Sequence, residues 1–376
     1  MSSSLPADPA AARSLTGVVA HQLASLTGDD DWLPPAQSSI VFVVDGLGRA
    51  NLSARSGHAR FLAGAMTKKD IAYTVFPSTT AAALTSLLTG VEPGMHGLVG
   101  YRLRIPGTDQ APNQLKGWES HGLDPITWQR AQPLFEREAR AGRPVFVVTK
   151  PEYAATGFTE ATLRGAAFVG ADDLDERVER AADTAARHPG ALVYLYAPEL
   201  DSLGHRHGWE SDEWSAGLER VDAAARRLAE LVSPRTGVLI TADHGMVDVP
   251  RHRHLLLRDG DGLTDGVRVI GGEPRMLHLY AEPGQAAAVH TAWQAAEGGR
   301  SWVLTREEAV RAGLFGPTDP EVLPRIGDVL VAARAGIAYY DDRLSDKGPQ
   351  RMVGQHGSLT AEERIVPLIR LGAYAR

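Results

Sequence analysis

Hydrophobic positions along the chain gather in short continuous runs, which alternate with longer segments of mixed polarity. Short runs rich in Val, Ile and Leu are typical of strands that are buried on both faces of a sheet. The longer segments between them predict helices over 49–66, 80–90, 127–141, 172–188 and 212–232. Strands that alternate with helices in this way predict an α/β fold with a doubly wound, mostly parallel sheet. The predicted strands are SSIVFVV (38–44), IAYTVF (71–76), PVFVVTK (144–150), AAFVG (166–170), ALVYLYA (191–197) and GVLITAD (237–243).

The stretch 249–345 has a different order of elements. It predicts strand (PRMLHLYA), helix (AAAVHTAWQAA), strand (SWVLT), helix (REEAVRAG) and strand (IGDVLVAA). Because this α+β segment lies between two motif-bearing regions, we expect it to be a small inserted cap. The expected catalytic core is then 38–248 together with 346–376. Residues 1–37 are expected to form an N-terminal tail with a helix near 11–26, ended by Pro34 and Pro35.

Composition narrows the class of protein. The 376 residues are 43% hydrophobic, which suits a large core, and 39 Lys/Arg against 46 Asp/Glu give a net charge of −7. Without a basic stripe, stable binding of polymeric nucleic acid is not expected. The lack of Cys excludes thiolate metal sites and Cys nucleophiles. With no secretory signal pattern and no apolar run near the roughly 18 residues of a membrane helix, we expect a cytoplasmic protein without a membrane anchor.

Three aspartates follow predicted strands. Asp45 ends IVFVVD, Asp201 follows VYLYAPEL and Asp243 ends VLITAD. Ligands of an open α/β sheet bind beyond the carboxyl ends of its strands, so these carboxylates are expected to converge there. A single Asp in such a place is usually a helix cap or turn residue. Three in comparable places, two of them followed by His, favour a metal site instead.

Three histidines complete this candidate set. His205 lies four residues after Asp201, so one helical turn or a tight loop can aim both at one cation. His244 directly follows Asp243, and His356 stands in GQHGS before the apolar strand IVPLI. His207 is a competing ligand, which we expect to be exposed or only adjacent to the site. Two divalent cations held by Asp and His can clamp the attacking and departing oxygens of an in-line phosphoryl displacement.

A hydroxyl near such cations can act as the nucleophile, and Thr80 is the candidate. It begins the predicted helix in FPSTTAAALTSLLTG, where the helix dipole and free N–H groups favour phosphate oxygens. The alternative is that Ser78, Thr79 and Thr80 only cap the helix. The residue pattern by itself does not separate Thr79 from Thr80.

The ordered motifs D-G, P-S-T-T…T-G…H-G, E-L-D-x-x-G-H-x-x-G, A-D-H-G-M and G-x-H-G run from Asp45 to His356. Together they resemble the alkaline phosphatase superfamily, and most of all its type I phosphodiesterase/nucleotide pyrophosphatase branch. The resemblance implies a mostly parallel sheet with helices on both faces and two zinc ions at its carboxyl edge; Mn²⁺ is the less expected ion. The branch places its nucleophile ten residues before the Gly of T-G, here Gly90, which favours Thr80.

Residue roles follow from the same resemblance. One zinc would be held by Asp201, His205 and His356, and the other by Asp45, Asp243, His244 and the Thr80 oxygen. The implied reaction is hydrolysis of a phosphodiester or phosphoanhydride bond in a small phosphate ester or nucleotide, through a covalent phosphothreonine. The alternatives are a phosphonoacetate-hydrolase-like C–P hydrolase, a phosphomonoesterase, or a non-catalytic metal-binding protein. The last is disfavoured because structural metal sites are closed, whereas Thr80 implies open coordination.

One departure from the branch concerns the substrate. Branch members commonly carry an Asn a few residues after H-G, whereas this chain reads H-G-L-V-G-Y-R, with Tyr101 at that place and Arg102 next. Either side chain could contact a phosphate oxygen. Tyr153 and Phe158 are candidates for stacking on a nucleobase, although ordinary packing is the alternative for both.

Overall fold

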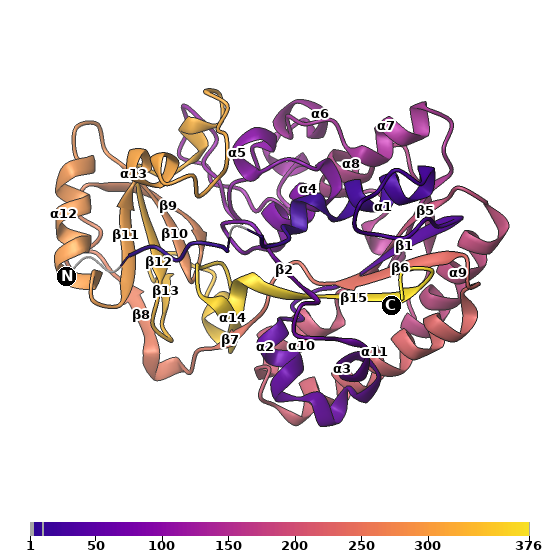
Figure 1. The fold of residues 1–376 in the computed structure, drawn as a ribbon. Helices are drawn as coiled ribbons and strands as arrows, with labels where there is room; N and C mark the ends of the chain where they lie inside the picture. Colours follow the sequence, from indigo (N-terminus) through magenta and orange to yellow (C-terminus); the bar gives the residue numbers. More distant parts are fainter. Residues whose placement is uncertain (1–3, 10, 376) are drawn as a thin grey trace.

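A seven-stranded sheet forms the centre of the computed structural model, which describes residues 4–9 and 11–375 (Figure 1). The strand order is β2-β15-β6-β1-β5-β3-β4. β1 pairs in parallel with β5 and β6, and β3 pairs in parallel with β4 and β5, whereas β15 is antiparallel to both neighbours. The prediction of a mostly parallel α/β sheet is therefore confirmed. The strands are β1 (Ser38–Val44), β2 (Ile71–Tyr73), β3 (Val145–Thr149), β4 (Ala167–Gly170), β5 (Leu192–Ala197), β6 (Thr236–Thr241) and β15 (Ile365–Gly372).

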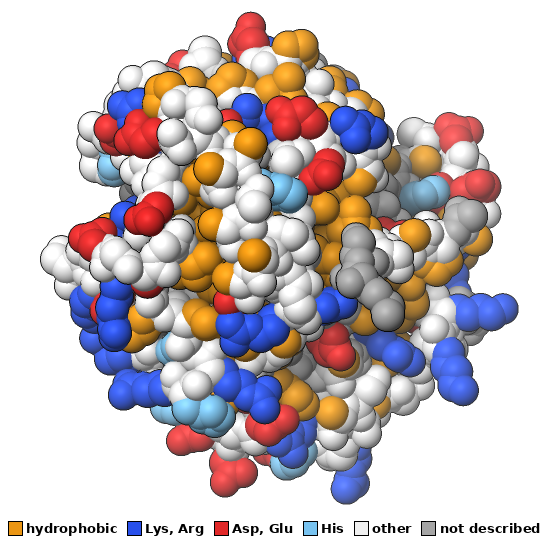
Figure 2. Space-filling view, turned by 90° about the vertical axis from the view of Figure 1, so that its left-hand side faces the viewer, with side chains coloured by type: hydrophobic (Ala, Val, Ile, Leu, Met, Phe, Trp, Pro, Cys, Tyr) orange, Lys and Arg blue, Asp and Glu red, His pale blue; other side chains and the backbone are white. Residues whose placement is uncertain are grey.

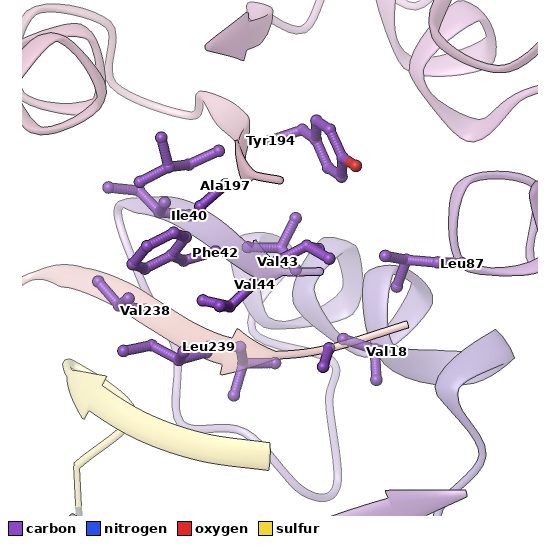
Figure 3. Close-up of a cluster of buried hydrophobic side chains, with 14 of the residues drawn as sticks. Val18, Ile40, Phe42, Val43, Val44, Leu87, Tyr194, Ala197, Val238 and Leu239 are labelled. Atoms are coloured by element: carbon purple, nitrogen blue, oxygen red, sulfur yellow. The ribbon is translucent and has the colours of Figure 1, made fainter. Parts of the chain in front are cut away.

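Helices cover both faces of this sheet (Figure 1). All seven residues of β1 are buried, as expected of a continuous apolar run at the centre of a sheet. Figure 3 shows side chains of β1 and β6 packed beside Val18 and Leu87 from the helices on one face. That face carries α1 (Val18–Thr27), α4 (Thr80–Thr89), α7 (Leu134–Arg140) and α8 (Gly157–Leu163). The other carries α2 (Arg49–Ala54), α3 (Arg60–Ala65), α9 (Leu174–Arg187), α10 (Glu199–His207) and α11 (Asp212–Leu231).

A second sheet, with strand order β11-β12-β10-β9, is antiparallel throughout. Its elements lie within 249–345, where the cap was expected, and α12 packs on it through Trp293. A hydrophobic cluster also joins it to the segment after α4, because Leu103 and Trp118 lie in one cluster with Met276 and Phe315. The elements are β9 (Val267–Glu273), β10 (Met276–Ala281), α12 (Ala286–Glu297), β11 (Ser301–Thr305), α13 (Arg306–Arg311) and β12 (Val329–Ala333).

Short elements connect the two sheets. β7 pairs with β14 in an antiparallel bridge, and β8 pairs in parallel with β13. These are β7 (Val247–Asp248), β8 (His254–Leu257), β13 (Ala338–Asp341) and β14 (Gly354–Gln355), with the short helices α5 (Pro93–His96), α6 (Pro125–Trp128) and α14 (Ala361–Arg364).

Three predicted helices are wrong in their extent. The segment 127–141 divides into α6 and α7, because Pro133 cannot donate an N–H within a helix and instead precedes the first turn of α7. The segment 49–66 divides at a 3₁₀ turn over Ser56–His58. Near the N-terminus a 3₁₀ turn over Leu15–Gly17 precedes α1, so helix begins later than residue 11; residues 1–3 and 10 of the predicted tail lie outside the described residues.

The surface carries both signs of charge. Figure 2 faces the side of the molecule formed by the second sheet and α12, where Lys and Arg are interspersed with Asp and Glu. Across residues 4–9 and 11–375, none of the helices combines the length and apolar character that crossing a bilayer requires.

Candidate metal centre

The carboxyl edge of the central sheet brings the three aspartates together. Asp45 directly follows β1, and Asp243 comes two residues after the end of β6. Asp201 lies in the first turn of α10, which follows β5, and His205 is one turn later on the same helix. Because β1, β5 and β6 are parallel neighbours, their carboxyl ends meet at one place.

Glycines allow the loops at this edge to approach one another. Gly46 has φ +75°, and a Cβ built there would lie 3.1 Å from the Cα of Asp201. At Gly245 a Cβ would lie 2.0 Å from the carbonyl oxygen of Glu362. Side chains at either position would therefore push apart the loops that carry Asp45, Asp201 and His244.

The six Asp and His residues form two groups of three, each with ligand atoms within 4.8 Å of one another. The first group (site A) is Asp201, His205 and His356; the second (site B) is Asp45, Asp243 and His244. The two sites adjoin, because the rings of His244 and His356 stack with centroids 3.5 Å apart. The Thr80 hydroxyl lies 3.1 Å from His244 Nε2.

Each histidine directs its Nε2 atom toward the carboxylates of the two sites. Nδ1 lies against a backbone carbonyl in all three: 2.8 Å from that of Gly354 for His205, 3.1 Å from that of Gly245 for His244, and 3.0 Å from that of Ser78 for His356. A carbonyl can only accept, so Nδ1 carries the proton of the neutral ring. The lone pair on Nε2 is then free to bind a metal, an arrangement common to metal-binding histidines.

Carboxylate oxygens face these nitrogens. Asp45 Oδ1, Asp201 Oδ1 and Asp243 Oδ2 are buried and have no hydrogen-bond partner. The distance from His205 Nε2 to Asp201 Oδ1 is 3.3 Å, and His244 Nε2 is 3.4 Å from both Asp45 Oδ1 and Asp243 Oδ2. Lone pairs that meet in a buried place without a proton repel one another, whereas a cation between them satisfies both. The oxygen and imidazole donors of both sites therefore fit a divalent cation such as zinc.

The pKa shifts of Asp45 and His356 in the metal-free site also favour a bound cation. Burial, with Asp243 and Asp201 nearby, holds the pKa of Asp45 well above its usual range. Burial, with His244 and His205 nearby, holds the pKa of His356 well below its usual range. A bound cation would reverse the penalty on the Asp45 carboxylate, because its charge offsets both the burial and the neighbouring carboxylates.

Thr80, rather than its neighbours, presents its hydroxyl to the candidate ligand His244. It is the first residue of α4, and Thr79 is the N-cap but makes no side-chain capping bond. Ser78 instead donates its hydroxyl proton to the carbonyl of Ser358 at 2.7 Å. The capping alternative therefore does not account for these hydroxyls, and the Thr80 oxygen faces His244.

Tyr101 lies near Asp201 of site A and beside Glu273, and Arg102 follows it in the same loop. The Tyr101 hydroxyl oxygen accepts from the Asn113 side-chain amide at 2.6 Å, so its own proton can point elsewhere. Burial raises the pKa of Tyr101, and Asp201 and Glu273 raise it further. The Arg102 Nε donates to the carbonyl of Ala111 at 3.1 Å, which ties the guanidinium to its own loop.

The other sequence candidates contact neighbouring side chains. Tyr153 meets the ring of Tyr196 edge-on, with centroids 6.1 Å apart. Phe158 packs against two hydrophobic clusters, which is the packing alternative for this residue. His207 lies 3.8 Å from Glu213 and belongs to neither site among the described residues.

Glu273, the last residue of β9, was not anticipated from the sequence. One carboxylate oxygen accepts from the Tyr101 N–H at 3.1 Å, and a Cβ at Gly357 would lie 2.5 Å from its Cγ. The second sheet thus places a buried carboxyl beside the loop of His356. The sequence held no signal for it, because Gly271 and Gly272 interrupt the apolar pattern of β9.

We expect Glu273 to make stability depend on pH. Burial raises its pKa from 4.5 to about 8, so the folded protein keeps a proton that the unfolded chain loses above pH 4.5. The part of the unfolding free energy that depends on this proton is fully present below pH 4.5 and is lost as the pH rises through about 8. Relative to wild type, Glu273→Gln should therefore gain unfolding free energy between about pH 5 and about pH 8 and then level off.

The measurement is urea denaturation of metal-free protein across that range. Glu282→Gln is the matched control, because Glu282 is exposed in the loop after β10. A difference between Glu273→Gln and wild type that stays constant with pH would show that Glu273 does not retain its proton in the fold.

A family model and several known proteins are similar to this chain. A family model described as type I phosphodiesterase/nucleotide pyrophosphatase matches residues 39–359. The chain is 25% identical over 198 residues to an uncharacterized pyrophosphatase/phosphodiesterase of Schizosaccharomyces pombe, covering 48% of this chain and 39% of that protein. Over 190 residues it is 27% identical to human ectonucleotide pyrophosphatase/phosphodiesterase family member 7, covering 47% of this chain and 40% of that protein. The aligned segments thus span two fifths or less of these relatives.

Solved structures share the fold at low identity. An inactive variant of murine ectonucleotide pyrophosphatase/phosphodiesterase 5 in complex with AMP gives a TM-score of 0.69 at 17% identity, covering 90% of this chain and 88% of that one. Phosphonoacetate hydrolase from Sinorhizobium meliloti gives a TM-score of 0.64 at 19% identity, covering 90% of this chain and 91% of that one.

Proposed function

The chain belongs to the type I phosphodiesterase/nucleotide pyrophosphatase family, and from that membership we propose that it is a zinc-dependent phosphodiesterase or nucleotide pyrophosphatase. It hydrolyses a phosphodiester or phosphoanhydride bond in a small phosphate ester or nucleotide. The observation that carries the proposal is the 3.1 Å approach of the Thr80 hydroxyl to His244 Nε2, at the edge of two adjoining groups of unsatisfied ligand atoms.

In this proposal site A holds one zinc through Asp201, His205 and His356. Site B holds the other through Asp45, Asp243, His244 and the oxygen of Thr80. Bound there, paired divalent cations supply the positive charge that stabilises the attacking and departing oxygens of an in-line displacement. Carboxylate and imidazole ligands suit zinc; Mn²⁺, which also accepts carboxylates, is the second candidate.

Thr80 is the nucleophile of the proposed reaction. Its alkoxide forms a new O–P bond while the bond from phosphorus to the leaving oxygen breaks, and water then hydrolyses the phosphothreonine ester. Its place as first residue of α4 puts free backbone N–H groups and the positive end of the helix beside the phosphate oxygens. The Nδ1–carbonyl bonds of the three histidines hold their rings in the orientation that the reaction needs.

We further propose that Tyr101 donates its hydroxyl proton to a non-bridging phosphate oxygen. Asn113 already donates to the Tyr101 oxygen, so the two residues together replace the Asn that the family commonly uses. Arg102 adds positive charge from the same loop, and Tyr153, which meets the ring of Tyr196 beside Asp45, borders the space for a leaving group. The cap, 249–345, contributes through Glu273, while 38–248 and 346–376 carry the metal ligands.

The second candidate is C–P or phosphomonoester hydrolysis at the same centre. The observation that supports this second candidate is the fold that the chain shares with phosphonoacetate hydrolase. A metal-binding protein without turnover is disfavoured. Structural metal sites are closed, whereas the Thr80 hydroxyl beside His244 implies a site with open coordination.

A substrate panel on zinc-loaded protein separates these candidates. It comprises bis-p-nitrophenyl phosphate, p-nitrophenyl phosphate, phosphonoacetate and a nucleoside triphosphate, all compared by kcat/KM. We expect the diester or the anhydride to react at least about tenfold faster than the others, a difference of ~1.4 kcal/mol in activation free energy. Faster turnover of the monoester or of phosphonoacetate would overturn the proposed substrate class.

A further inference from the structure

Tyr196 lies beside the candidate metal centre but outside the motifs D-G, E-L-D-x-x-G-H-x-x-G and A-D-H-G-M. It is the fifth residue of β5, and the parallel register places it next to Val43 on β1, two residues before Asp45. Its hydroxyl donates a hydrogen bond to Asp45 Oδ2. The bond therefore joins two neighbouring strands at the edge where the ligands converge.

This bond occupies one oxygen of Asp45 and leaves the other without a hydrogen-bond partner. Oδ2 accepts from Tyr196, whereas Oδ1 is buried without a partner and lies 3.4 Å from His244 Nε2. Asp243, the other carboxylate of site B, has the same arrangement. Its Oδ1 accepts the N–H groups of Gly46 and His244 at 3.2 and 3.0 Å, and its Oδ2 remains free.

The ring of Tyr196 is held by two neighbours. Tyr194 stacks on it with centroids 6.0 Å apart and an interplanar angle of 14°, and Tyr153 meets it edge-on at 6.1 Å. Aromatic contacts of these kinds have preferred geometries, so they restrict the rotation of the ring. A donor that is fixed in this way fixes its acceptor, and the Asp45 carboxylate cannot rotate without losing the bond.

We propose that Tyr196 is a positioning residue that makes Asp45 a one-oxygen ligand and so sets the cation affinity of site B independently of site A. This inference uses the metal assignment of the proposed function. Partners that hold metal ligands in place typically change metal affinity by about 10- to 100-fold when they are removed. Because Asp201 and the two histidines of site A make no contact with Tyr196 among the described hydrogen bonds, site A should not respond.

The test is a Zn²⁺ titration of metal-free protein against a competing chelator. Tyr196→Phe keeps the ring and its packing but removes the donor. To read each site alone, we place this change in a His356→Ala background, which leaves site B, and in an Asp243→Asn background, which leaves site A. We expect zinc to bind about tenfold more weakly to site B and with unchanged affinity to site A.

Tyr194→Phe is the matched control. It removes a hydroxyl from the same strand two residues earlier, where no described hydrogen bond reaches a ligand, so both affinities should remain at the wild-type values. Thermal denaturation of the metal-free variants checks that the fold is retained.

The titration results distinguish failure of the role proposed for Tyr196 from failure of the proposed function. If wild type binds two zinc ions and Tyr196→Phe changes neither affinity, or both equally, the role of Tyr196 is overturned while the proposed function stands. If wild type binds no zinc, both are overturned together.

Discussion

Thr80→Ala should lower kcat by about three orders of magnitude or more while both cations remain bound, because removal of a covalent nucleophile leaves only weaker routes through water. The hydroxyl is the group that approaches His244 Nε2 at 3.1 Å, and site B keeps its three other proposed ligands without it. The measurement pairs steady-state kinetics on bis-p-nitrophenyl phosphate with elemental analysis of the same samples.

Thr79→Ala provides the control for this prediction. It deletes the same atoms one residue earlier, from a buried hydroxyl that does not approach His244 among the described hydrogen bonds. We expect its kcat to stay within about tenfold of wild type, as for a change outside the reacting groups. Near-normal turnover by Thr80→Ala would remove Thr80 from the role of nucleophile.

Loss of one ligand from either site should be nearly as severe. Asp243→Asn replaces the carboxylate whose Oδ2 lies 3.4 Å from His244 Nε2. His356→Ala removes the proposed site A ligand whose ring is oriented by the Ser78 carbonyl. Each variant should lose about one zinc ion per chain by elemental analysis, and kcat should fall by a factor of roughly 10³, because both cations stabilise the transition state.

His207→Ala is the control for the ligand variants. His207 stands on the same helix as His205 but faces Glu213, outside both sites. Its metal content should match that of wild type. Unchanged zinc stoichiometry in Asp243→Asn or His356→Ala would remove that residue from the ligand set.

Much of the site could be predicted from the sequence because its geometry follows from local rules. A carboxylate within two residues of the end of a buried parallel strand must lie at the carboxyl edge of the sheet, and this applies to Asp45 and Asp243 alike. The spacing of Asp201 and His205 left a helical turn or a loop open, and the structure shows the helix α10. The choice of Thr80 over Thr79 needed the family resemblance, and the orientation of Thr80 toward His244 supports it.

Other contacts could not be predicted, because they arise from pairing across long stretches of chain. Tyr196 reaches Asp45 only through the register of β5 on β1, which no local pattern specifies. Glu273 depends on β9, where Gly271 leaves room for the backbone of Arg102, since a Cβ there would lie 2.6 Å from the Arg102 carbonyl oxygen. Glycine lowers strand propensity, so Gly271, which allows this contact, also kept the sequence pattern from predicting β9.

The most direct test of the paired metal sites is anomalous diffraction at the zinc edge from crystals grown with zinc. Two peaks should appear at the carboxyl edge of the central sheet, one among Asp201, His205 and His356 and one among Asp45, Asp243, His244 and the Thr80 oxygen. A map in which zinc lies elsewhere, or in which these side chains contact no ion, would contradict the assignment of this centre.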